Sequence, residues 1–157
     1  MKNMKKNFLI VLLAFIASLS FAQTWQNPMN VSGQPDMGIG DPYIFKFRGT
    51  YYMYSSSRDV EIRCWKSKDL ISWSEAIVCS TDPIAKNAYA PEVVYWNGIF
   101  YMYTSPQGNG HYVLTSNSPT GPFVSASGNL QKKIDGSVFI DDDAKWYFYH
   151  ANSSGIQ

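Results

Sequence analysis

Residues 41–55 read DPYIFKFRGTYYMYS. Two runs rich in aromatic residues flank a central turn, which is the pattern of two strands joined in a hairpin. The same pattern recurs at residues 93–105 (VVYWNGIFYMYTS) and at residues 138–152 (VFIDDDAKWYFYHAN). The chain is therefore built from at least three copies of one strand, turn and strand unit.

These three units recur at a regular interval. Their turns align at Gly49, Gly98 and Ala144, which are 49 and 46 residues apart (98 − 49 and 144 − 98). A period of this size is typical of the blades of a β-propeller. Two further strand-like runs follow each of the first two hairpins, at residues 61–67 and 75–80 and at residues 111–118 and 123–127. Four strands make one blade of a propeller.

The composition agrees with a fold made of strands. Aromatic residues make up 16% of the chain, which favours strands over helices. We therefore predict an all-β protein that contains about two and a half propeller blades, and we expect its unclosed edges to need further blades. A stand-alone β-sandwich is the structural alternative.

The first 22 residues have the pattern of a secretory signal peptide. Three lysines precede the apolar run 8–17, and Ser20 and Ala22 supply the small residues of a cleavage site. The apolar run is shorter than the roughly 20 residues that a membrane span needs. We predict a signal peptide at 1–22, a propeller domain at 23–157, secretion or release into the periplasm, and no stable membrane insertion.

Net charge and cysteine content exclude two classes of function. Removal of the three signal lysines changes the formal net charge from +1 to −2 (1 − 3 = −2), so a nucleic-acid partner is not expected. The two cysteines, Cys64 and Cys79, form no CxxC motif, which argues against a structural zinc site. The two cysteines lie in runs that can pair as one hairpin. There they form either a disulfide or two buried thiols.

A short acidic motif stands at or just before the start of each hairpin. The motifs are Gly-Asp-Pro at 40–42, Ala-Pro-Glu at 90–92 and Ile-Asp-Gly-Ser at 134–137. The first strand of each propeller blade lines the central channel, so acids at equivalent positions converge on one pocket. Inverting glycoside hydrolysis needs two carboxyl groups that hold a water and a sugar between them. The arrangement of these acids therefore suits glycoside hydrolysis.

The order of these motifs resembles glycoside hydrolase family 43. The resemblance rests on residues 41–55, on Ser-Lys-Asp-Leu-Ile-Ser-Trp at 67–73, on Ala-Pro-Glu-Val at 90–93 and on residues 134–143. It implies a five-bladed β-propeller that cleaves arabinose-, xylose- or galactose-containing plant polysaccharides with inversion. It implies no cofactor, although some relatives hold calcium in the channel.

The resemblance also implies a role for each acid. Asp41 would be the general base, and Asp135 would tune the pKa of the proton donor and orient it. The donor itself, a Glu that opens the fourth blade in this family, has no counterpart in the 157 residues, so this fragment is expected to be inactive. Gly136 replaces the commoner Pro after the acid, which loosens the backbone at Asp135.

The remaining candidates are contacts to substrate. We expect Glu92 to bind substrate or to support the site rather than to replace the proton donor. Tyr89 and Trp96 are candidates for stacking on sugar rings, with core packing as the alternative. The histidines His111 and His150 belong to no motif. A carbohydrate-binding propeller without catalytic activity is the alternative function.

Overall fold

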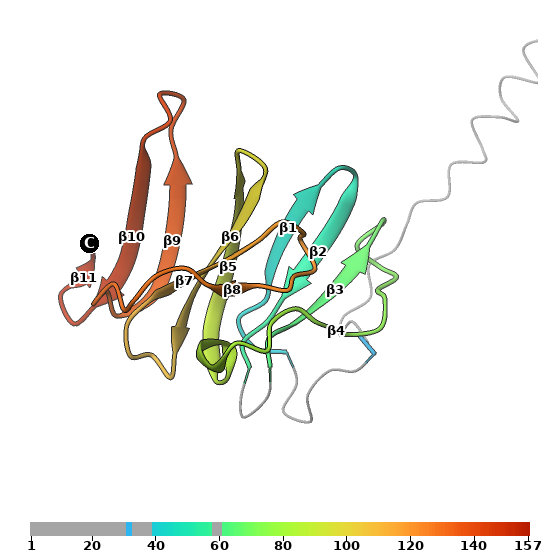
Figure 1. The fold of residues 1–157 in the computed structure, drawn as a ribbon, viewed down its shortest axis with the longest axis horizontal. Coiled ribbons are helices and arrows are strands. Elements are labelled where there is room, and N and C mark those ends of the chain that lie inside the picture. The colour runs from blue at the N-terminus through green and yellow to red at the C-terminus, as the bar shows by residue number, and fades with distance from the viewer. Residues whose placement is uncertain (1–30, 33–38, 58–60) are drawn as a thin grey trace, which may run out of the picture.

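The computed structural model describes residues 31–32, 39–57 and 61–157, and the predicted signal peptide lies outside these ranges. The described residues form three antiparallel sheets that stand side by side, with the first hairpin of each sheet at the same side of the molecule (Figure 1). In this part of the chain, no helix is long and apolar enough to cross a membrane. The predicted all-β class is confirmed.

The first two sheets have the same four-stranded order, in which each strand pairs with the next along the chain. The first contains β1 (Tyr43–Phe47), β2 (Thr50–Tyr54), β3 (Arg63–Ser67) and β4 (Ile77–Val78). The second contains β5 (Ala88–Trp96), β6 (Ile99–Pro106), β7 (Tyr112–Ser116) and β8 (Val124–Ser125). A single turn of 3₁₀ helix, η1 (Pro83–Ala85), lies between them. The predicted outer strands are confirmed, although β4 and β8 are shorter than expected.

The third sheet contains β9 (Ile134–Ile140), β10 (Trp146–Asn152) and β11 (Gly155–Ile156), in the order β11-β10-β9. The sequence pattern predicted only two strands here. The structure adds β11, which turns back from β10 and pairs Gly155 with Asn152 and Ile156 with Ala151. The third unit therefore repeats the start of the other two sheets.

The aligned turns have a common backbone conformation. Arg48 and Gly49 have φ angles of 47° and 74°, and Asn97 and Gly98 have φ angles of 47° and 88°. Two-residue hairpin turns of this kind need positive φ at both central residues, which explains the glycine in second position. Ala144, in the third hairpin, also has a positive φ of 65°. The repeat inferred from the sequence is thus a repeat of backbone geometry.

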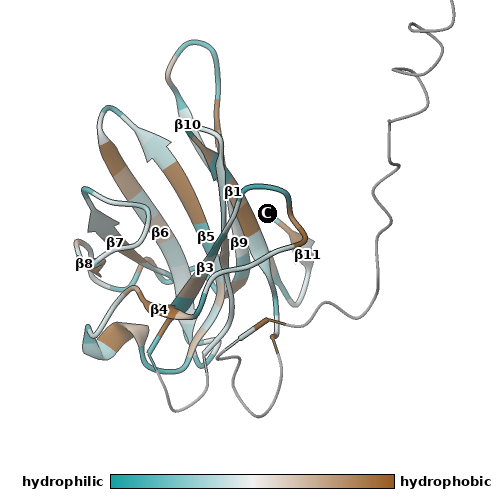
Figure 2. Ribbon diagram, turned by 90° about the vertical axis from the view of Figure 1, so that its right-hand side faces the viewer, coloured by the Kyte–Doolittle hydropathy of each residue, from teal (hydrophilic) through white to brown (hydrophobic). Residues whose placement is uncertain are grey.

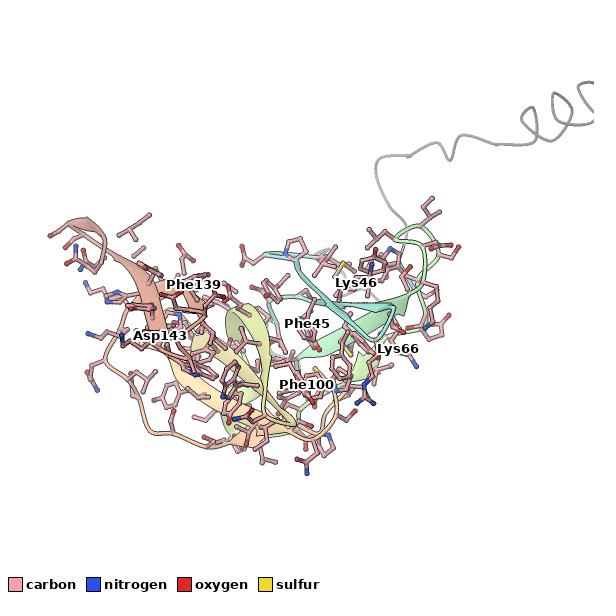
Figure 3. All side chains as sticks on the ribbon, turned by 90° about the horizontal axis from the view of Figure 1, so that it is seen from above. Phe45, Lys46, Lys66, Phe100, Phe139 and Asp143 are labelled. Carbon is pink, nitrogen blue, oxygen red and sulfur yellow. The ribbon has the colours of Figure 1, made fainter. Side chains whose placement is uncertain are left out.

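Aromatic side chains fill the space between the first and second sheets. Phe45 and Phe47 on β1 meet Phe100 on β6 edge to face, with ring centroids 6.1 and 4.9 Å apart. Figure 3 shows Phe45 and Phe100 in this space, and it shows the three sheets arranged in an arc. Hydrophobic residues lie along several strands, including β5 and β6 (Figure 2). The core of the described structure therefore lies between sheets.

Both cysteines belong to this core as free thiols. Cys64 lies on β3 and Cys79 follows β4, so the two are neighbours in one hairpin, as the sequence indicated. Burial raises the pKa of the Cys79 thiol, and its Sγ lies 3.3 Å from the carbonyl oxygen of Ile62. Of the two alternatives from the sequence, the structure has the buried thiols.

Hydrogen bonds join the first sheet to the second around this core. Tyr54 Oη donates to the carbonyl oxygen of Pro119 at 2.6 Å, and Ser80 Oγ donates to that of Phe123 at 2.6 Å. The Phe123 N–H donates to the carbonyl oxygen of Cys79 at 2.8 Å. Burial raises the pKa of Tyr54, so its hydroxyl remains a donor. The two sheets are therefore held by polar as well as apolar contacts.

Replacement of Tyr54 by Phe tests the contribution of one such bond. We expect the free energy of unfolding to fall by about 1–2 kcal/mol, because the carbonyl oxygen of Pro119 loses its donor. Urea denaturation of the full chain measures the change. The matched control is Tyr147→Phe, because Tyr147 is 39% exposed and its loss should alter stability by less than about 0.5 kcal/mol. Equal stability of the two variants would contradict the expectation.

Candidate active site at the starts of the inner strands

Three residues at the starts of the inner strands share an unusual backbone conformation. Asp41, Ala90 and Asp135 have φ angles of 47°, 43° and 54°. Residues other than glycine rarely adopt positive φ, so its repetition at one place in each sheet identifies structurally equivalent positions. The spacings, 49 and 45 residues (90 − 41 and 135 − 90), are within one residue of those of the hairpin turns. Asp41 and Asp135 are therefore equivalent acids.

The inner strands place these residues on one side of the molecule. β1 contacts β5, and β5 contacts β9. All three strands run from the candidate acids towards the hairpin turns, which lie together at the opposite side (Figure 1). Asp41 and Asp135 are both exposed to solvent. Both acids therefore lie at the end of their sheets opposite to the hairpin turns.

The equivalent position in the second sheet holds Ala90, which corrects the expectation that Glu92 is the acid of that position. Glu92 lies two residues further along β5, where the pairing of β5 with β6 shifts register between Tyr89 and Glu92. The Ala-Pro at residues 90–91 occupies the place of the Asp-Pro at residues 41–42, so the acid of the Ala-Pro-Glu motif comes two residues after the turn position. Glu92 therefore lies inside the strand, whereas Asp41 precedes β1.

Glu92 connects the second sheet to the third. Its Oε1 accepts hydrogen bonds from the Val138 N–H at 2.7 Å and from the Ser137 hydroxyl at 3.3 Å, both on β9. Its charge also contributes, after burial, to raising the pKa of Tyr43 on β1 to about 12. Glu92 is thus close to all three inner strands. Its hydrogen bonds join β5 to β9.

The carboxylate of Asp41 accepts a hydrogen bond from a residue at the end of the neighbouring strand, β2. Ser56, which follows β2, donates from its hydroxyl to Asp41 Oδ2 at 2.6 Å. The Ser56 N–H donates to the carbonyl oxygen of Gly40 at 2.9 Å, and the Ala90 N–H donates to Ser56 Oγ at 2.8 Å. The start of β1 and the start of β5 are therefore tied together at the proposed base.

Asp135 is positioned through its neighbour Gly136. The Gly136 N–H donates to Nε2 of the buried His111 at 3.0 Å, and Nδ1 of His111 lies 3.0 Å from the carbonyl oxygen of Lys132. Nε2 must accept and Nδ1 must donate, so these contacts assign the neutral tautomer with its hydrogen on Nδ1. Sequence reasoning missed His111, because this residue belongs to no motif and lies 25 residues before Gly136.

Gly136 is required by packing, not by flexibility. A Cβ atom at this position would lie 2.6 Å from His111 Nε2 and as close to the ring of Phe148. The ring of Phe148 also contacts His111 edge to face, at 5.0 Å between centroids. The expectation that Gly136 loosens the backbone is therefore wrong, because the residue is buried and hydrogen-bonded. The segment that presents Asp135 is closely packed.

The two aromatic candidates lie at different places. Tyr89 is next to Ala90 at the start of β5 and is partly buried. Trp96 ends the same strand, six residues after Ala90, which corresponds to roughly 20 Å of strand. There it packs edge to face on Trp146, with ring centroids 6.2 Å apart. The structure thus places Tyr89 at the same end of β5 as Ala90 and places Trp96 at the hairpin end.

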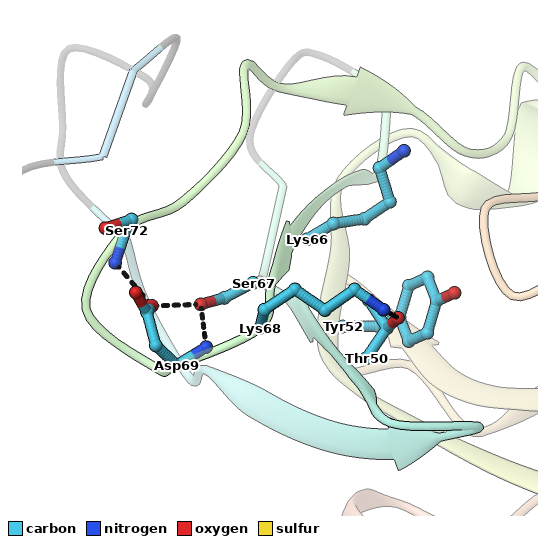
Figure 4. Close-up of a pocket in the computed structure, with 7 residues that line it drawn as sticks. All are labelled: Thr50, Tyr52, Lys66, Ser67, Lys68, Asp69 and Ser72. Carbon is cyan, nitrogen blue, oxygen red and sulfur yellow. Dashed lines mark hydrogen bonds between the residues drawn. The ribbon is translucent and has the colours of Figure 1, made fainter.

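A hollow of about 400 Å³ lies elsewhere in the first sheet, at the hairpin side (Figure 4). Lys68 donates to the Thr50 hydroxyl there, and Asp69 accepts from the backbone N–H groups of Ile71 and Ser72. These bonds, with that from Ser67, lower the pKa of Asp69 to about 2. The polar groups of this hollow are occupied in forming a turn, so the starts of the inner strands remain the candidate site.

The described residues contain no group of three or more His, Cys, Asp or Glu side chains that could hold a metal ion. The acidic run Asp141–Asp143 forms the third hairpin turn, where Asp143 pairs with Lys145.

The buried His111 gives a prediction for pH. Burial lowers its pKa from the ordinary value of 6.5, with a small contribution from His150, while the Lys132 carbonyl and Asp135 oppose the shift. In the unfolded chain the histidine takes up a proton more readily than in the folded chain. The free energy of unfolding should therefore fall as pH drops below 6.5 and be fully retained above it.

Urea denaturation at pH 7.5 and pH 5 measures this effect. We expect His111→Gln to have a smaller fall in stability between the two pH values than the wild type. His150→Gln is the matched control, and it should retain most of the fall because it leaves His111 in place. A His111→Gln variant with the same pH dependence as the wild type would contradict the assignment.

Comparison with known proteins identifies a family. The profile of Glycosyl hydrolases family 43 matches residues 37–157. A xylosidase/arabinosidase of Butyrivibrio fibrisolvens is 35% identical over 80 residues, covering 47% of this chain and 16% of the relative. An α-L-arabinofuranosidase structure from Clostridium thermocellum has a TM-score of 0.65 and 28% identity, covering 74% of this chain and 49% of that chain.

The structural likeness extends to more distant proteins. An exo-β-1,3-galactanase from Phanerochaete chrysosporium has a TM-score of 0.63 at 20% identity, covering 80% of this chain and 36% of that chain. The chain spans about half the length of the arabinofuranosidase and less of the other two relatives. The three sheets are blades of the predicted β-propeller type. Since the family profile spans most of the chain, this protein belongs to glycosyl hydrolases family 43.

Proposed function

We propose that the protein containing this chain is an exported, inverting glycosidase that acts on arabinose-, xylose- or galactose-containing plant polysaccharides. The observation that carries this proposal is the equivalent placement of Asp41 and Asp135 at the starts of two inner strands, both exposed and both in the same backbone conformation. The names of the relatives, a xylosidase/arabinosidase and an α-L-arabinofuranosidase, support the choice of sugars. The signal-like sequence at residues 1–22 supports export.

The proposed mechanism assigns different work to the two acids. Asp41 takes a proton from the water that attacks the anomeric carbon, as the base of an inverting glycosidase does. Asp135 acts on the proton donor, whose pKa it raises through its negative charge and whose carboxyl group it orients. Inversion follows because the water attacks from the face opposite the leaving group.

The proton donor is assigned to none of the described residues. Glu92 is the remaining acid among the inner strands, and its Oε1 accepts two hydrogen bonds from β9. This carboxylate is engaged with the backbone and a side chain of β9, which favours a supporting role over proton donation. On this proposal the donor belongs to a further blade, and residues 1–157 alone are expected to be inactive.

Substitution of the proposed base tests the function. Asp41→Asn in the protein containing this chain should lower kcat on arabino- or xylo-oligosaccharides by about 10² to 10⁴-fold, because the amide cannot accept the proton from water. The release of reducing sugar measures the rate.

Asp142→Asn is the matched control, since Asp142 is an exposed acid at the hairpin end of β9. Its kcat should stay within about two-fold of the wild type. Unchanged turnover by Asp41→Asn would exclude Asp41 as the base. Binding of oligosaccharides by the wild type without any hydrolysis would replace the proposal with the carbohydrate-binding alternative.

A further inference from the structure

Ser56 makes a chain of hydrogen bonds across the junction of the first two blades. Its hydroxyl oxygen accepts the Ala90 N–H at 2.8 Å and donates to Asp41 Oδ2 at 2.6 Å. A hydroxyl group has a single hydrogen, and an N–H group can only donate. The Ala90 contact therefore leaves the hydroxyl hydrogen for the carboxylate of Asp41, and the donor direction at this contact is defined.

The backbone around Ser56 reinforces this contact. Its own N–H donates to the carbonyl oxygen of Gly40 at 2.9 Å, immediately before Asp41. Asp41 and Ala90 both have positive φ, which is costly for residues with a Cβ and persists only where the surroundings hold it. Ser56 contacts both strained segments at once. Ser56 therefore couples the position of the second blade to the orientation of the Asp41 side chain.

We propose that Ser56 is a positioning residue that selects which oxygen of Asp41 acts as the base. This inference rests on the proposed function of Asp41. The hydroxyl of Ser56 holds Oδ2, so Oδ1 is the oxygen left for the attacking water. Because Asp41 is exposed, its carboxylate would otherwise turn freely in solvent. A reacting group misplaced by about 1 Å can cost 10²-fold in rate, so a single fixed orientation has a large effect on kcat.

The adjacent residue Ser57 supplies a matched control. Its hydroxyl accepts the Ala88 N–H at 2.9 Å and donates to the carbonyl oxygen of Ala85 at 3.0 Å. Ser57 thus also bridges to the start of β5, through Ala88 instead of Ala90, and it is buried. None of its hydrogen bonds described here involves Asp41. Substitutions at the two serines therefore distinguish the loss of a contact between blades from the loss of the contact to the base.

The experiment compares Ser56→Ala and Ser57→Ala in the protein that contains this chain. We expect Ser56→Ala to lower kcat about 10- to 100-fold with a KM within about three-fold of the wild type, because the lost contact is to the base rather than to the sugar. Ser57→Ala should lower the melting temperature but keep kcat within about three-fold.

Two further variants separate positioning from folding. Thr and Val have nearly the same shape, but only Thr retains the hydroxyl, so Ser56→Thr should recover most of the kcat and Ser56→Val should not. In the Asp41→Asn background, Ser56→Ala should cause little additional loss, because residues that act through one another are not additive. An ordinary structural role would give additive losses.

The outcomes are distinguishable. Equal kcat in Ser56→Thr and Ser56→Val, or a full additional loss in the Asp41→Asn background, would overturn the role of Ser56 while leaving the proposed function intact. A wild type that hydrolyses no oligosaccharide would overturn the proposed function and the role of Ser56 with it. Loss of kcat in Ser56→Ala, with recovery in Ser56→Thr and retention in Ser57→Ala, supports the proposal.

Discussion

The packing of the first blade against the second is the contact on which the rest of the described structure depends. Phe45 and Phe47 reach across to Phe100, and the same apolar cluster includes Tyr54 and both cysteines. Neither sheet can bury this surface alone, because each sheet has only one face in the junction. The cluster therefore sets the distance between β1 and β5, and with it the distance between Asp41 and the backbone of Ala90 that Ser56 spans.

The organisation of the fold could be predicted because it depends on patterns within short stretches of sequence. Hairpins depend on aromatic runs and on a turn with positive φ, and both are visible within about 15 residues of sequence. The equivalence of Asp41 and Asp135 could be predicted for the same reason, since it follows from the period of the repeat. The short strand β11 was missed because Gly155 and Ile156 form no pattern of their own.

The surroundings of the acids could not be predicted, because they come from contacts between distant segments. Ser56 lies 15 residues from Asp41 and 34 from Ala90, and its position beside both follows only from the folding of β2 against β1 and of one blade against the next. Glu92 was assigned to an equivalent position because it is the acid of its motif, although the residue that aligns with Asp41 is Ala90. Trp96 was grouped with Tyr89 by type, although the length of β5 separates them.

The residue after the backbone turn has an N–H group only in the third blade, which explains the role of His111. In the first two blades the residue after the turn is Pro42 or Pro91, and proline has no N–H group to satisfy. Gly136 does have one, and it is buried. A buried donor without a partner is costly, so the replacement of proline by glycine requires an acceptor. His111 Nε2 is that acceptor, and the ring occupies the space where a Cβ or a proline ring would otherwise be. Gly136 and His111 therefore depend on each other. A larger residue at position 136 would collide with the His111 ring, and loss of His111 would remove the acceptor of the Gly136 N–H.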